Sequence, residues 1–134
     1  MRTISTIAIH HSQNRKTIDD IKNLHVNKYK WDDIGYHFVI DKNGEILRGR
    51  NVEKIGAHVY NFNENSIGIC LIGNFDIENP GNLQLNSLLN LIKELKIKYN
   101  VEKILGHREF PNALKTCPGI NIDLDKIRKL SQII

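Results

Sequence analysis

A short stretch, Ser66 to Ile72, most of it the apolar run from Ile67 onward, restricts the folds open to this chain. It carries no charge and is typical of a strand that is buried on both faces. An amphipathic helix from about Leu83 to Tyr99 can cover one of those faces. The apolar residues along that helix are Leu85, Leu88, Leu89, Ile92 and Leu95. The pattern predicts an α/β fold, a single domain with a mixed central β-sheet flanked by helices.

The rest of the chain divides into further strand-like and helix-like segments. Strands are predicted at Thr3–His10, Tyr36–Ile40, Glu45–Arg50 and Lys103–Leu105, and helices at Thr17–Tyr29 and around Leu124–Leu130. Thr17 is the expected N-cap of its helix. Asn43-Gly44 is a strong hairpin signal between two of the strands. A loop is expected from Gly106 to Asn121.

Size and charge limit the class of protein. At 134 residues, the chain can bury one core but not two, so residues 1–134 are expected to form one domain. The formal charge of +4 suits an anionic surface such as a cell wall. Lysine and arginine are scattered along the chain, which argues against a nucleic-acid arm.

Location can also be inferred from the sequence pattern. No segment approaches the roughly 20 apolar residues that span a bilayer, so no membrane insertion is expected. The first ten residues lack the pattern of a secretory signal, so we expect synthesis in the cytoplasm without a signal peptide. The two cysteines, Cys70 and Cys117, make a poor disulfide framework. Cys70 lies in the apolar stretch and is expected to be buried and inert.

Two histidines and the other cysteine are candidate zinc ligands. Imidazole nitrogen and thiolate sulfur both suit zinc, and a catalytic zinc keeps three protein ligands and one open position. His10 ends a predicted strand, His107 follows another, and Cys117 precedes Pro118-Gly119, which can turn the backbone. A histidine taken alone is more often structural, so spacing by itself leaves this site open.

Six short motifs occur in order along the chain. They are Ile9-His10-His11-Ser12, Asp33-Ile34-Gly35-Tyr36-His37-Phe38, Gly56-Ala57-His58, Asn65-Ser66-Ile67-Gly68-Ile69, Gly106-His107-Arg108-Glu109 and Lys115-Thr116-Cys117-Pro118-Gly119. In this order the chain resembles the type-2 N-acetylmuramoyl-L-alanine amidases, which include phage lysozyme-type amidases and animal peptidoglycan-recognition proteins. The resemblance extends from about Thr6 to Gly119.

The resemblance implies one zinc ion per chain, held by His10, His107 and Cys117. It also implies catalytic roles for Tyr36 and Lys115. The chemistry has a use for each group, because zinc can activate water and polarise a carbonyl. A lysine can stabilise a developing oxyanion, and a tyrosine can help to move a proton. The alternatives are a sheet-edge aromatic for Tyr36 and a solvated loop cation for Lys115.

Four more histidine side chains receive roles. The resemblance implies that His25 and His58 line the peptide-binding cleft, although His25 can also be the wet edge of a helix and His58 a loop residue. Strand alternation turns His11 and His37 away from their neighbours, so both are expected to be structural.

One position departs from part of the family. The cytoplasmic anhydro-muramyl-peptide amidases carry a catalytic glutamate where this chain has Cys70, so proton handling is left to Tyr36. The ten-residue separation of His107 and Cys117 resembles that glutamate-bearing branch. The tyrosine and the cysteine ligand resemble the phage and animal branch, so the subfamily stays open.

The resemblance implies zinc-dependent hydrolysis of the amide bond between the N-acetylmuramic acid lactyl group and L-alanine. The substrate would be peptidoglycan or soluble muropeptides, cut by a monomeric phage-type endolysin or bacterial cell-wall amidase after its release or delivery. One alternative is a binding module that has lost catalysis, and another is a regulatory protein that binds a partner enzyme. A third is a cysteine hydrolase with Cys117 as nucleophile and His107 as base, which leaves His10 without a role.

Overall fold

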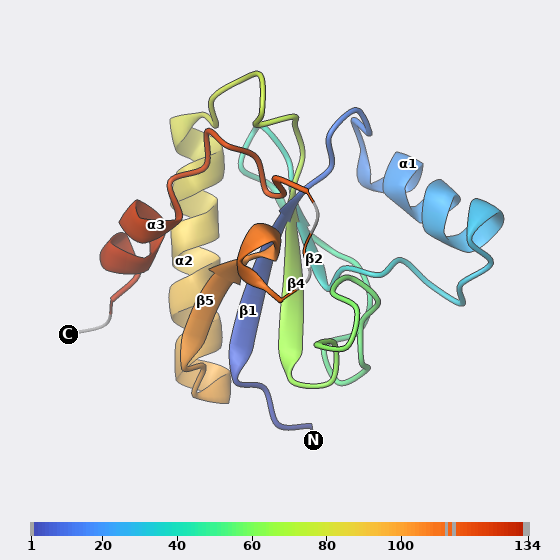
Figure 1. Ribbon diagram of the computed structural model, residues 1–134, viewed down its shortest axis with the longest axis horizontal. Helices are drawn as coiled ribbons and strands as arrows, with labels where there is room; N and C mark the ends of the chain where they lie inside the picture. The colour runs from blue at the N-terminus through green and yellow to red at the C-terminus, as the bar shows by residue number, and fades with distance from the viewer. Residues whose placement is uncertain (1, 112, 114, 133–134) are drawn as a thin grey trace.

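The computed structural model describes residues 2–111, 113 and 115–132 (Figure 1). The elements are β1 (Thr6–His11), α1 (Ile18–Asn23), η1 (Leu24–Lys28), β2 (Phe38–Ile40), β3 (Ile46–Arg48), β4 (Ser66–Leu71), α2 (Asn82–Tyr99), β5 (Lys103–Gly106), η2 (His107–Glu109) and α3 (Leu124–Leu130). Positions 1, 112, 114, 133 and 134 of the expected domain and loop lie outside the described residues.

The sheet has five strands in the order β3-β2-β4-β1-β5. β4 pairs in parallel with β1 and β2, β1 pairs in parallel with β5, and β3 pairs antiparallel with β2. The predicted mixed sheet is therefore confirmed. Because β1, β4 and β5 run in the same direction, their C-terminal ends meet at one edge of the sheet.

The long helix α2 covers one face of the sheet (Figure 1). Its buried residues Leu88, Leu91, Ile92 and Leu95 share a core with isoleucines of β1 and β4. Leu85 and Leu89, also predicted for this face, pack half-buried against the same core.

Gln84 on α2 is buried against the sheet, a contact that the spacing of apolar residues along the helix did not predict. The amide nitrogen of Gln84 donates to the carbonyl oxygens of Ile40 and Ile72, each at 3.0 Å. Ile40 is the last residue of β2 and Ile72 directly follows β4, so the side chain ties the helix to both strands. The two hydrogen bonds satisfy the buried amide nitrogen, whereas the Gln84 side-chain oxygen has no partner among the described residues.

The opposite face of the sheet is covered by shorter pieces of chain. Cys70 is fully buried there, as predicted, and packs with Ile21 and Ile34. Farther along, Ala8 packs with Val59 and Phe110. Loops and the short helix α1 therefore cover this face, and the candidate site lies among them.

Several predicted boundaries need correction. β1 begins at Thr6 and ends at His11, later than predicted at both ends. The helix predicted at Thr17–Tyr29 changes to a π-helical turn, η1, after Asn23. Its predicted N-cap is confirmed, because the Thr17 hydroxyl accepts from the backbone nitrogen of Asp20. Within the described residues, no helix combines the length and apolar character needed to cross a membrane.

Candidate functional site

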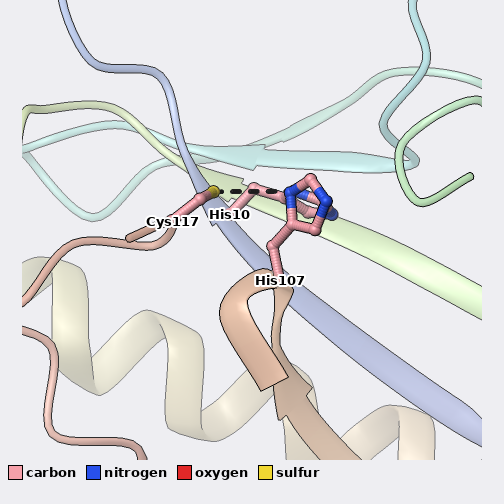
Figure 2. A group of neighbouring side chains, drawn as sticks. All are labelled: His10, His107 and Cys117. Atoms are coloured by element: carbon pink, nitrogen blue, oxygen red, sulfur yellow. Dashed lines mark hydrogen bonds between the residues drawn. The ribbon is translucent and has the colours of Figure 1, made fainter. Parts of the chain in front are cut away.

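Three chain segments converge at the C-terminal edge of the sheet. His10 lies near the end of β1, His107 begins η2 directly after β5, and Cys117 lies in the loop that follows. One potential ligand atom from each residue lies within 4.8 Å of the other two. Figure 2 shows the three side chains turned toward one another, with His10 Nδ1 3.8 Å from the Cys117 sulfur. The structure thus brings together the three residues predicted as zinc ligands.

The donor atoms of this cluster suit zinc chemically. Burial lowers the pKa of His10 well below its usual value, and the nearby rings of His58 and His107 lower it further. Burial also lowers the pKa of His107, with a smaller contribution from Lys115. Both rings are therefore neutral near pH 7 and offer a lone pair. Two imidazoles and one thiol form a donor set that zinc accepts.

The thiol of Cys117 is half-buried in the same cluster. Burial raises the pKa of Cys117 to about 11, although a hydrogen bond from the His11 backbone nitrogen to the sulfur opposes this. Arg108 and Lys115 lower the pKa only partly, so without a bound metal ion the thiol keeps its proton at neutral pH. This is unfavourable for a nucleophilic cysteine, whereas a metal ion can displace the proton.

Arg108 holds the loop that carries Cys117. Its backbone nitrogen donates to the Cys117 carbonyl oxygen at 2.7 Å. Its guanidinium group donates to the carbonyl oxygens of Thr116, Gly119 and Ile122. Because Arg108 directly follows His107, one short segment positions two of the three candidate ligands.

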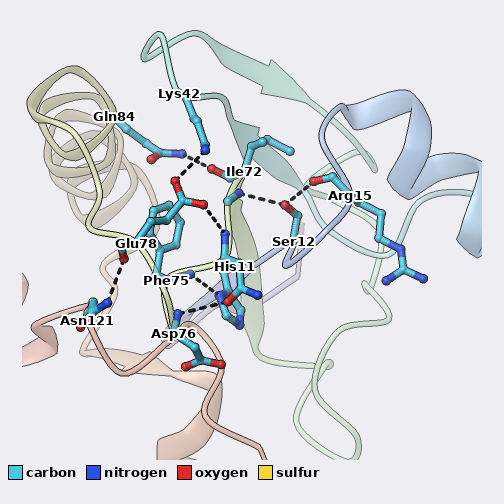
Figure 3. Close-up of polar contacts among 12 residues, drawn as sticks. His11, Ser12, Arg15, Lys42, Ile72, Phe75, Asp76, Glu78, Gln84 and Asn121 are labelled. Carbon is cyan, nitrogen blue, oxygen red and sulfur yellow. Dashed lines mark hydrogen bonds and ion pairs between the residues drawn. The ribbon is translucent and has the colours of Figure 1, made fainter.

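A polar network joins the end of β1 to the segment after β4 (Figure 3). His11 Nδ1 accepts from the backbone nitrogen of Phe75 at 3.1 Å. This contact is consistent with the structural role predicted for His11. The carboxylate of Asp76 accepts from the Thr116 hydroxyl at 2.7 and 2.8 Å. The position of the Cys117 sulfur therefore depends on contacts from β1, from the segment after β4 and from Arg108.

A pocket beside the cluster contains the other predicted site residues. Tyr36, Lys115, His25 and His58 all line it, and α1 and η1 contribute to its wall. Tyr36 lies beside the cluster, with its ring centroid 4.9 Å from that of His10. Burial raises the pKa of Tyr36 well above its usual value, and Cys70 and Cys117 add to the effect. The hydroxyl is therefore protonated at neutral pH and can donate a hydrogen bond.

His25 and Arg50 position the segment that leads to Tyr36. His25 is buried in η1, and its Nδ1 accepts from the Gly35 backbone nitrogen at 2.9 Å. The guanidinium of Arg50 donates to the carbonyl oxygens of Asp33, Ile34 and Ile55. Arg50 was not predicted as a site residue, because surface and buried arginines look alike in a single sequence.

His58 contacts the metal-ligand cluster as well as the pocket. Its Nδ1 lies 3.0 Å from His10 Nε2, and its ring packs over the bare Cα of Gly68. From the sequence, only a cleft contact is predicted for His58. The ring centroid of His37 lies 5.7 Å from that of His58. His37 Nδ1 accepts from the Gly68 backbone nitrogen, so His37 has a structural place.

Comparison with known proteins agrees with this arrangement. A family model described as N-acetylmuramoyl-L-alanine amidase matches residues 1–120. The chain belongs to this amidase family. The matched residues include every residue predicted for the metal cluster and the pocket.

Members of the amidase family with similar sequences or structures include phage, bacterial and animal proteins. The endolysin of Klebsiella phage KP32 is 34% identical over 127 aligned residues, covering 88% of this chain and 82% of the endolysin. The structure of N-acetylmuramoyl-L-alanine amidase LysC from Clostridium intestinale has a TM-score of 0.89 and 33% identity, covering 96% of this chain and 85% of LysC. Peptidoglycan-recognition protein LB of Drosophila melanogaster is 37% identical over 107 residues, covering 78% of this chain and 45% of that protein.

The close packing of His58 on β4 gives a stability prediction for this amidase-family chain. A Cβ added at Gly68 would lie 2.7 Å from His58 Cγ, so Gly68→Ala should lower the free energy of unfolding by about 1–3 kcal/mol. Urea denaturation measures this change. Gly81→Ala is the matched control, because a Cβ there meets nothing within 4 Å, and its loss should be smaller. Equal stability of Gly68→Ala and the parent would contradict the packing argument.

Buried histidines away from the cluster predict loss of stability in acid. Burial lowers the pKa of both His25 and His37 to about 4, from the usual 6.5. Below pH 6.5 the unfolded chain binds protons that the folded chain does not. The free energy of unfolding should therefore be nearly constant from pH 7.5 to 6.5 and fall as the pH approaches 4.

Urea denaturation between pH 7.5 and 4.5, with a chelator present, tests this sign. The variant His37→Gln should show a shallower fall than the parent, because one of the titrating groups is gone. Identical slopes for the two proteins would contradict the assignment.

Proposed function

We propose that this chain is a zinc-dependent amidase acting on peptidoglycan. The bond cut is the amide between the lactyl group of N-acetylmuramic acid and L-alanine. The observation that carries the proposal is the convergence of His10, His107 and Cys117 beside a pocket lined by Tyr36 and Lys115. Residues 1–134 act as one catalytic domain.

The three converging residues hold one zinc ion. Their neutral rings and displaceable thiol proton match what zinc requires of its ligands. Bound zinc supplies Lewis-acid chemistry, because it polarises a carbonyl and lowers the pKa of water. The protein's part is to fix the donor atoms, and the clamp formed by Arg108 on the Cys117 loop does this.

Tyr36 and Lys115 handle the proton and the developing charge. The ring of Tyr36 lies beside His10 and lines the pocket, and its protonated hydroxyl is the group that donates to the attacking water or to the departing amine. The ammonium group of Lys115 stabilises the oxyanion that forms on the scissile carbonyl. With Cys70 buried and uncharged, Tyr36 takes the proton role that a glutamate has in another branch of the family.

The substrate peptide lies in the pocket, where His25 and His58 contact it. Because Nδ1 of His25 is engaged by the Gly35 backbone nitrogen, the opposite edge of that ring is left for the peptide. Both ring nitrogens of His58 are engaged, by His10 and by Ser66, so His58 contacts the peptide through its ring carbons. The chain works as a monomer on the cell wall after release or delivery, as a phage-type endolysin or a bacterial wall amidase. Relatives with both kinds of name support this location.

A peptidoglycan-binding module without catalysis is the second candidate. The relative named peptidoglycan-recognition protein LB favours it. The presence of all three candidate ligands together with Tyr36 and Lys115 supports the enzyme. A cysteine hydrolase is disfavoured, because the raised pKa of Cys117 keeps the thiol protonated and His10 would have no role.

Product analysis distinguishes these functions. Digestion of purified peptidoglycan should release peptides with a new amino-terminal alanine, create no new reducing sugar ends, and stop when a chelator is added. Binding without release would indicate the recognition module. Reducing ends without new amines would indicate a glycosidase, and activity lost to thiol alkylation but not to chelation would indicate the cysteine hydrolase.

A further inference from the structure

A chain of hydrogen bonds runs from the metal-ligand cluster to the start of β4. His58 Nδ1 lies 3.0 Å from His10 Nε2, and His58 Nε2 lies 3.3 Å from the hydroxyl oxygen of Ser66. That hydroxyl in turn lies 2.8 Å from the carbonyl oxygen of Phe62. The donor and acceptor capacity of each of these groups is known, so the proton of each hydrogen bond in the series can be assigned to one atom.

The assignment starts at the carbonyl of Phe62. A carbonyl oxygen only accepts, so Ser66 donates its single hydroxyl proton to it. The Ser66 oxygen can then only accept from His58, which places a proton on His58 Nε2. A neutral imidazole carries one proton, so His58 Nδ1 accepts from His10 Nε2.

This assignment leaves the lone pair of His10 on Nδ1. Nδ1 is also the atom that faces the Cys117 sulfur, at 3.8 Å (Figure 2). We propose that Ser66 is a positioning residue that sets the tautomer of His58 and, through it, presents His10 Nδ1 as the zinc-binding atom. The inference rests on the zinc site proposed above and gives a role to a serine whose function the amidase chemistry alone does not explain.

Neighbouring residues hold His58, Ser66 and the Phe62 carbonyl in place. The side-chain oxygen of Asn63 accepts from the backbone nitrogens of His58 and Val59, each at 2.9 Å, and so closes the turn that contains Phe62. Ser66 is 1% exposed, so water does not compete for its hydroxyl. Gly68 leaves room for the His58 ring. A hydrogen-bond partner fixed in this way orients a metal-binding histidine, and its loss typically weakens metal binding about 10–100-fold.

Nuclear magnetic resonance of the imidazole nitrogens tests the proton assignment directly. In the zinc-loaded protein, the ring protons of His10 and His58 should both be on Nε2, and the His58 proton should stay there after chelation. A proton on His58 Nδ1 in either state would overturn the proposal. Because this measurement reads the tautomer and not activity, it gives an answer even if the proposed amidase function fails.

Replacing the serine tests the consequence for the metal. Ser66→Ala should raise the dissociation constant for zinc about 10–100-fold, measured by competition with a chelator. The His58 proton should then no longer be confined to Nε2. Ser87→Ala is the matched control: its hydroxyl also donates to a backbone carbonyl, that of Gly44, but on α2. The control should leave zinc affinity unchanged, and unchanged affinity in Ser66→Ala would overturn the proposal.

Discussion

The Tyr36→Phe variant should fold and bind zinc like the parent but cleave muropeptides roughly 10²–10⁴ times more slowly. The substitution keeps the ring beside His10 and removes only the hydroxyl, which is the proposed proton-handling group. Turnover at saturating substrate, together with zinc content, measures the effect. Tyr60→Phe is the matched control, because Tyr60 is 87% exposed and loses the same hydroxyl.

The result that would contradict this role is full turnover in Tyr36→Phe with zinc retained. The tyrosine would then be a structural aromatic of the pocket wall. The proton-handling role would fall to Lys115, which also lines the pocket and lies near His107. Loss of both zinc and turnover would contradict the role in another way, because it would make Tyr36 part of the metal site.

The Cys117→Ser variant should lose zinc first and activity with it. A serine hydroxyl is a poor zinc ligand compared with a thiolate, so affinity should fall by more than the roughly 10–100-fold typical of losing an outer partner. Cys117→Asp should keep part of both metal and activity, because a carboxylate oxygen also binds zinc, at about 2.0–2.2 Å. Elemental analysis and wall lysis measure the two effects.

Cys70→Ala provides the matched thiol control for this series. Cys70 is buried in β4 and is not one of the clustered donors, so its removal should leave zinc content unchanged. Zinc content that falls in Cys70→Ala and stays constant in Cys117→Ser would contradict the ligand assignment.

Much of the fold is predictable because its signals are local. The apolar stretch that became β4 and the spaced leucines of α2 each mark a segment without reference to the rest of the chain. The metal cluster is predictable only through the order of the six motifs. His10 and His107 meet because β1 and β5 are parallel neighbours, and that pairing does not follow from the spacing of two histidines.

The contacts that escaped prediction depend on loops meeting in space. His58 reaches His10 because the Asn63 side chain folds the turn after it and Gly68 leaves room for its ring. Arg50 reaches three carbonyls of other segments, and Gln84 reaches the ends of two strands. Each of these side chains is polar, and a pattern of apolar residues carries no information about where it lies.

The central claim is that one zinc ion on His10, His107 and Cys117 is required to cut the lactyl–alanine amide bond. Mass spectrometry of muropeptides digested by metal-stripped protein, before and after return of one equivalent of zinc, tests it most directly. The account predicts intact muropeptides with the stripped protein and release of alanine-terminated peptides once zinc is returned. Full release of those peptides by protein shown to contain no metal would contradict it.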